Sequence, residues 1–151
     1  FSSIFNFNSI SSLLSAIIYK IIFKIYLKPL YVFIIGIMKI IEYNNINFIV
    51  GQSAQENWDI LTEYTNKNNE YIWFHLNSFP SCYVIMESSI QDISNESLQD
   101  YLNYGALLCK DHSKYKFLKD LKICYTSLKK LTKTNKIGEV IIKGKKNIIK
   151  L

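Results

Sequence analysis

The sequence predicts a single α+β domain that has a mixed, mostly antiparallel sheet and two main helices. The chain has 151 residues, 49% of them hydrophobic, which is enough for one core of ordinary size and too little for a large multidomain enzyme. From residue 38 onward, short runs rich in β-branched and aromatic residues alternate with two segments of helical periodicity. The resulting order, β-β-α-β-β-α-β-β-β, is typical of an α+β fold.

The first predicted element after residue 38 is a β-hairpin over residues 39–50. Two β-rich runs flank Asn44 and Asn45, and asparagine tolerates the left-handed conformation that a tight hairpin turn needs. Gly51 then breaks the second strand.

A capping box predicts where the first helix begins. The Ser53 hydroxyl can accept a hydrogen bond from the amide of Glu56, while the Glu56 side chain reaches back to the start of the helix. We therefore expect a helix over about residues 54–65, with Trp58 and Leu61 on one face.

A second helix is expected over about residues 95–111, capped by Asp92 or Ser94. Its apolar residues recur at spacings of three and four, which indicates one buried face. The turn at Gly144 and Lys145 predicts that the last two strands form a closing hairpin. The remaining strands are expected at residues 71–76, 83–86, 121–126, 140–143 and 147–151.

Charge is distributed unevenly along the chain. The 18 basic residues are all lysines and give a net charge of +6. Residues 1–37 contribute +3, residues 38–109 contribute −7, and residues 110–151 contribute +10. A basic stretch of this kind favours binding to phosphates through counterion release, although a solvated lysine-rich face has the same composition. Tyr115, Phe117 and Tyr125 lie among these lysines and could stack on exposed bases.

Residues 1–37 form an apolar extension that contains lysine but no acidic residue. Lys20, Lys24 and Lys28 recur every fourth residue, so they would line one face of a helix. Three interpretations remain open: a membrane anchor, a basic helix lying on a membrane surface, or translated upstream sequence that precedes a true start at Met38.

The sequence contains no motif that is typical of an enzyme or a metal site. Cys82, Cys109 and Cys124 are isolated and odd in number, so we expect reduced thiols and no zinc. His75 and Ser81 could be a base and a nucleophile, but no nucleophile elbow surrounds Ser81. We therefore predict no catalytic residue, no cofactor, no metal and no small-molecule substrate.

Four runs of residues, in this order and spacing, carry a resemblance to a known family. They are GQSAQENWDIL from Gly51, IWFHL at 72–76, PSCYV at 80–84 and CYTSLKKLTK at 124–133. Together they resemble the NFACT-R domain of the tailing factors in ribosome quality control. The resemblance covers about residues 40–151 and is strongest to a short stand-alone branch, the coiled-coil domain-containing protein 25 relatives.

The resemblance assigns family positions to particular residues, and we expect many of them to be structural. Gln52 and Tyr83 depart from the family pattern, which has a basic residue and a histidine there. The matching family-motif positions are Gly51, Glu56, Asn57, Leu61, Trp73, Phe74, His75, Ser81, Val84, Tyr125, Thr126, Lys133 and Gly138.

The resemblance implies a non-enzymatic, cytoplasmic RNA-binding protein whose partner is tRNA or rRNA, with the large ribosomal subunit as a further possible partner. The alternative function is a membrane-anchored adaptor or nucleic-acid sensor that uses the same domain. The residues expected to contact the nucleic acid are His75, Tyr83, Lys110, Lys114, Tyr125, Lys129, Lys130 and Lys133.

Overall fold

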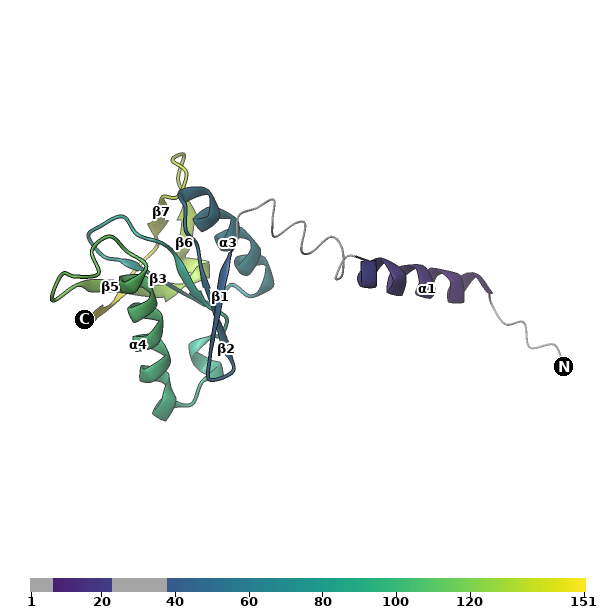
Figure 1. The fold of residues 1–151 in the computed structure, drawn as a ribbon, viewed down its shortest axis with the longest axis horizontal. Coiled ribbons are helices and arrows are strands. Elements are labelled where there is room, and N and C mark those ends of the chain that lie inside the picture. Colours follow the sequence, from purple (N-terminus) through teal and green to yellow (C-terminus); the bar gives the residue numbers. More distant parts are fainter. Residues whose placement is uncertain (1–6, 23–37) are drawn as a thin grey trace. The chain divides into compact units, whose positions relative to one another are not determined.

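The computed structural model describes residues 7–22 and 38–151 of the chain (Figure 1). The chain divides into two units, Phe1–Ile37 and Met38–Leu151, and each is described by itself. In the first unit, helix α1 spans Phe7–Ile22.

The three lysines expected to line one helical face in the first unit are only partly described. Lys20 lies in the last turn of α1. Lys24 and Lys28 lie outside the described residues, so the expected row of lysines is not tested. Within the described ranges, no helix combines the length and the apolar character that crossing a bilayer requires.

The second unit is built on a six-stranded sheet whose order is β1-β2-β4-β3-β5-β8. Every neighbouring pair in this sheet is antiparallel, which confirms the predicted α+β class with a mostly antiparallel sheet. The six strands are β1 (Lys39–Tyr43), β2 (Ile46–Val50), β3 (Ile72–Leu76), β4 (Val84–Met86), β5 (Lys122–Ser127) and β8 (Asn147–Lys150).

The predicted hairpin at the start of this unit is confirmed. Strands β1 and β2 pair in register from Lys39 opposite Val50 to Tyr43 opposite Ile46. Asn44 and Asn45 form the turn with φ angles of 46° and 66°. Both residues therefore adopt the left-handed conformation that a two-residue hairpin turn needs.

The capping box is also confirmed, at the start of helix α3 (Ala54–Lys67). The Ser53 Oγ accepts a hydrogen bond from the amide of Glu56 at 3.1 Å. The Glu56 carboxylate in turn accepts from the amide of Gln52 at 2.8 Å. Two amide donors at the helix start are thereby satisfied by side chains.

Helix α4 (Asn95–Asp111) matches the expected bounds, but its cap differs from the prediction. Ser94 occupies the N-cap position without a side-chain hydrogen bond to the helix. Asp92 does not cap the helix, because its carboxylate accepts a hydrogen bond from the hydroxyl of Ser89 at 2.7 Å. The short 3₁₀ helix η2 (Ile90–Asp92) leads into α4.

The buried side chains form two hydrophobic clusters, and both include residues of the sheet. The cluster beneath α4 contains Phe74 and the apolar face of that helix, including Leu102 and Ala106. The cluster beneath α3 contains Trp73 and Tyr83. The alternation along β3 therefore places Trp73 and Phe74 on opposite faces, as period two predicts.

The predicted closing hairpin is wrong. Strand β7 (Val140–Ile142) pairs with the short strand β6 (Leu131–Lys133), which follows the 3₁₀ helix η3 (Leu128–Lys130). Strand β8 pairs with β5 instead, from Lys122 opposite Lys150. Gly144 still turns the chain, with φ of 79°, but the strands on its two sides belong to different sheets.

Candidate nucleic-acid interface

The eight residues expected to contact a nucleic acid fall in several parts of the second unit. Lys110 is half-buried in the last turn of α4. Lys114 follows in the next loop and lines a groove of about 720 Å³ beside the start of α3. His112 lines the same groove, and its Nε2 lies 3.1 Å from the Nζ of Lys39.

Tyr125, Lys129 and Lys130 are brought together around a shallow cavity of about 200 Å³. The Lys129 Nζ lies 2.5 Å from a carboxylate oxygen of Glu70, in a pair that is about half exposed. Exposed pairs of this kind contribute about 1 kcal/mol or less, so a phosphate can compete with Glu70 for this lysine. Burial raises the pKa of Tyr125, which keeps its hydroxyl protonated.

Lys133 is occupied within the fold. Its Nζ donates to the hydroxyl of Thr62 at 2.5 Å and lies 5.0 Å from the centre of the Trp58 ring. These contacts tie strand β6 to α3. The Lys133 ammonium, which was expected to contact a nucleic acid, therefore contacts two side chains of its own chain.

His75 and Tyr83 lie in a groove along β3 with a volume of about 420 Å³. The rings of His75 and Trp73 are parallel within 3°, with centroids 5.4 Å apart. The ring of Tyr83 meets His75 edge-on at 5.5 Å. We call this the β3 groove; its lining includes Trp73, His75, Asn77, Pro80, Tyr83, Cys124, Lys136, Ile137, Gly138, Glu139, Val140, Ile142 and Lys146.

His75 and Tyr83, the two aromatic residues of the β3 groove that were expected to contact a nucleic acid, differ in how far they are exposed. His75 is half-buried, and burial together with the positive charge of Lys146 lowers its pKa, so the ring is neutral at physiological pH. Tyr83 is only 1% exposed, and its hydroxyl donates to the carbonyl of Gly138 at 2.6 Å. Tyr83 was expected to offer a surface for stacking, but a buried ring with a bonded hydroxyl supports the fold instead.

Several family-motif residues form one network between α3 and the turn before β4. The Asn57 Oδ1 accepts from the amide of Tyr83 at 2.9 Å, and its Nδ2 lies 3.4 Å from the carbonyl of Ser81. A Cβ on Gly51 would lie 2.4 Å from that Oδ1, which explains the glycine. The Ser81 hydroxyl accepts from Leu76 and is thereby held in the turn.

The other motif residues also have structural positions. Gly138 has φ of 82°, and a Cβ there would lie 2.7 Å from the side chain of Ala54. Phe74 is fully buried, and its ring would lie 2.5 Å from a Cβ on Gly105. Thr126 is 2% exposed. Each of these motif residues is buried or closely packed within the fold.

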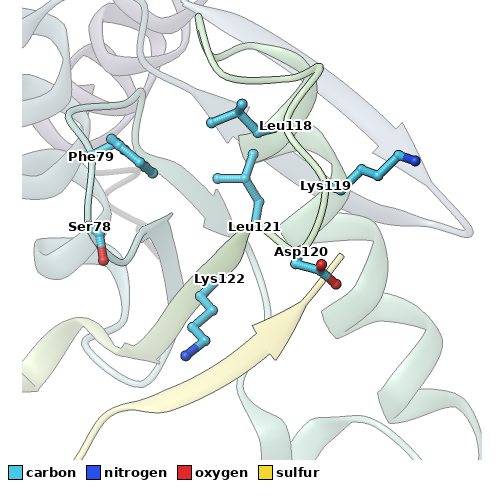
Figure 2. Close-up of a pocket in the computed structure, with 7 residues that line it drawn as sticks. All are labelled: Ser78, Phe79, Leu118, Lys119, Asp120, Leu121 and Lys122. Atoms are coloured by element: carbon cyan, nitrogen blue, oxygen red, sulfur yellow. The ribbon is translucent and has the colours of Figure 1, made fainter.

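The loop between α4 and β5 carries Phe117, which the sequence analysis expected to be available for stacking among the lysines. Phe117 is 86% exposed there, and the Nζ of Lys116 lies 5.1 Å from the centre of its ring. Phe79, Leu118 and Leu121 line a cavity of about 300 Å³. Figure 2 shows these three side chains facing one another, while Lys119 and Lys122 point away from them. The alternation of lysine with aromatic residues from 114 to 119 is the sequence signal that marks this loop.

The three cysteines are free thiols. Cys109 and Cys124 are buried, and Cys82 is half-buried. Burial raises the pKa of Cys124, so its thiol is protonated. Among the residues of known placement, no three histidine, cysteine or acidic side chains cluster in a way that could hold a metal ion.

Comparisons with known proteins agree with the architecture. The sequence model of a family described as the NFACT protein RNA binding domain matches residues 31–150. No match was found among curated proteins. Of the solved structures, the C-terminal part of the fibronectin/fibrinogen-binding protein from Streptococcus suis is similar, at 20% identity and a TM-score of 0.61. The similarity covers 76% of this chain and 44% of that chain, and at this identity it shows a shared fold.

Proposed function

The chain belongs to the NFACT RNA-binding domain family, and from this premise we propose that it is a non-enzymatic protein that binds tRNA or rRNA in translation quality control. The observation that carries the proposal is the concentration of positive charge in residues 110–151, which hold a net +10. Lysines gain from contact with phosphates because binding releases the counterions of the nucleic acid. The proposal includes the large ribosomal subunit as a further partner and a cytoplasmic location for the protein.

The lysines that support docking are those with few contacts to their own chain. Lys114 is exposed and lines the groove beside α3. Lys130 makes only a long contact, 3.5 Å from its Nζ to the carbonyl of Lys145. Lysine is a point charge that does not read base sequence, so this surface would set affinity and register while the shape of the RNA sets specificity.

The experiment is a salt series of binding affinities for the full chain, measured with tRNA and with an rRNA fragment. We expect the logarithm of the affinity to fall linearly with the logarithm of the salt concentration. Lys114→Gln and Lys130→Gln should each reduce the slope by about 1. Gln99→Glu is the matched control, because it changes the net charge equally but lies on an exposed part of α4 in the acidic region.

Two outcomes would contradict the proposal. The first is the lack of salt-dependent binding to either RNA. The second is equal loss of affinity in Gln99→Glu and the two lysine variants, which would mean that net charge alone governs binding. Cosedimentation of the chain with large ribosomal subunits tests the quality-control setting, and failure to cosediment would exclude the ribosome as the partner.

A further inference from the structure

We propose that the β3 groove holds one unstacked nucleotide of the bound RNA, with the base against His75 and the phosphate at Lys136 and Lys146. This inference rests on the proposed function and adds a defined site to it. A groove of about 420 Å³ is within the size range of sites that bind small molecules and cofactors. Unstacked bases of single-stranded RNA are commonly held on aromatic side chains, including histidine.

The aromatic part of the site is rigid. Trp73 is 2% exposed, and its ring lies parallel to that of His75, two residues further along the same strand. Tyr83 packs edge-on against both rings, with centroids 5.1 Å from Trp73 and 5.5 Å from His75. His75 is therefore held in one orientation while part of its ring stays exposed in the groove. A base that stacks on it extends an existing stack and orders few further groups.

The charges around the groove suit a nucleotide. Lys136 and Lys146 are exposed, and neither forms an ion pair within residues 38–151. The charge of Lys146 reaches His75, where it contributes to the lowered pKa. Glu139 is the acidic residue in the lining, and its charge acts on Tyr83. The end of the groove at His75 is therefore positive, and a phosphate there would be attracted.

Two side chains of the lining also carry buried polar atoms without partners. The Trp73 Nε1 is a donor and the Asn77 Oδ1 is an acceptor, and neither has a hydrogen-bond partner among the described residues. These residues precede and follow His75 on the chain at equal spacing. Leaving such atoms unpaired costs roughly 1–3 kcal/mol each. Both atoms have almost no accessible surface, so a base stacked on His75 does not reach them, and the site rests on the His75 ring and the two lysines.

The β3 groove should bind single-stranded RNA in preference to double-stranded RNA. The face of a base is covered by its neighbours in a duplex, so a duplex can reach the lysines of the surface but not the ring of His75. A short single strand can insert one base. The groove should therefore contribute to the binding of single-stranded segments and not to the binding of a blunt duplex.

The direct test is a nuclear magnetic resonance titration of the full chain with a single-stranded RNA tetranucleotide and with a blunt RNA duplex. The chain has two histidines, His75 and His112, so two ring signals report on two different grooves. We expect the tetranucleotide to shift the His75 signal saturably and the duplex to leave it in place. The pKa of His75 should rise in the complex, because a phosphate offsets the charge of Lys146.

Substitutions provide the second test. His75→Ala should weaken tetranucleotide binding between about 5-fold and 150-fold, the usual effect of removing a stacking side chain, with little effect on the duplex. His75→Phe should restore binding, since it keeps a flat ring. Lys146→Gln should weaken tetranucleotide binding at least about threefold more than Lys145→Gln. Lys145 is the matched control because it is an exposed neighbour outside the groove lining.

The inference would be overturned if the tetranucleotide left the His75 signal unmoved, or if His75→Ala weakened duplex and tetranucleotide binding equally. Either result, obtained while the chain still binds tRNA, refutes the groove and leaves the proposed function intact. Failure of the wild-type chain to bind tRNA, duplex and tetranucleotide alike would instead overturn the proposed function itself.

Discussion

Replacing Asn57 with alanine should destabilise the second unit by about 2 kcal/mol. Asn57 is 6% exposed and joins α3 to the turn before β4 through its side-chain amide. Its removal leaves the buried amide of Tyr83 without an acceptor, which costs about 1–3 kcal/mol. The contact with Ser81, at 3.4 Å, is long and adds little. At roughly 4 °C per kcal/mol for a domain of this size, the midpoint of thermal unfolding should fall by about 8 °C.

The assay is urea unfolding of the full chain, followed by far-ultraviolet circular dichroism. Gln55→Ala is the matched control, because Gln55 lies on the same helix, is exposed and bonds only to the side chain of Asp59. We expect the control to change the free energy of unfolding by less than about 0.5 kcal/mol. A loss below about 0.5 kcal/mol in Asn57→Ala would refute the role of this amide.

A double-mutant cycle with Gly51 tests the same network independently. Gly51→Ala alone should cost about 1–3 kcal/mol, because the new Cβ would displace the Asn57 Oδ1 from 2.4 Å away. Once Asn57 is alanine, that clash is gone and the second substitution should cost less. Additive losses, within about 0.5 kcal/mol, would show that Gly51 and Asn57 act separately.

Three further predictions concern the two faces of the sheet. Gly105→Ala should lower the free energy of unfolding by about 1–3 kcal/mol, measured by urea titration, because its Cβ would meet the Phe74 ring at 2.5 Å. Tyr83→Phe should cost about 1 kcal/mol and speed amide hydrogen exchange around Gly138, since it removes the hydroxyl bond to that carbonyl; unchanged exchange would contradict this. His75 has a lowered pKa in the folded chain, so its contribution to stability is full above the unfolded value of about 6.5 and is lost as pH falls through and below it. Between pH 7.5 and 5.5 the wild-type chain should therefore lose more stability than His75→Gln, and equal losses would disprove the shift.

The sequence predicted those elements whose signals are local. Asn44 and Asn45 lie next to each other, and Ser53 is three residues from Glu56, so each pair determines its own backbone conformation. The closing hairpin was wrong because Gly144 gives a turn signal without specifying a pairing partner. The partner of β8 is β5, which lies some twenty residues earlier, and no local pattern reveals that choice.

The candidate site was predicted only in part for the same reason. The alternation along β3 correctly placed Trp73 and His75 on one face. It did not reveal that Tyr83 is buried beneath the segment around Gly138, or that Lys146 lies near His75, because these contacts join residues more than fifty positions apart. Lys146 also stands beside Lys143 and Lys145 in the sequence, so nothing in the sequence marked it as the lysine near His75.

The two faces of the sheet differ in how much change they tolerate, because one is closely packed and the other includes a groove. The cluster beneath α4 is made of close contacts such as that of Phe74 with Gly105, where added volume is not tolerated. The opposite face includes the β3 groove, where exposed side chains such as Lys136 and Lys146 form part of the wall. Substitutions in that wall can alter which ligand is held while the packing beneath α4 stays unchanged. The binding preference of the groove can therefore change over evolutionary time while the stability of the fold, which depends on the packing beneath α4, is kept.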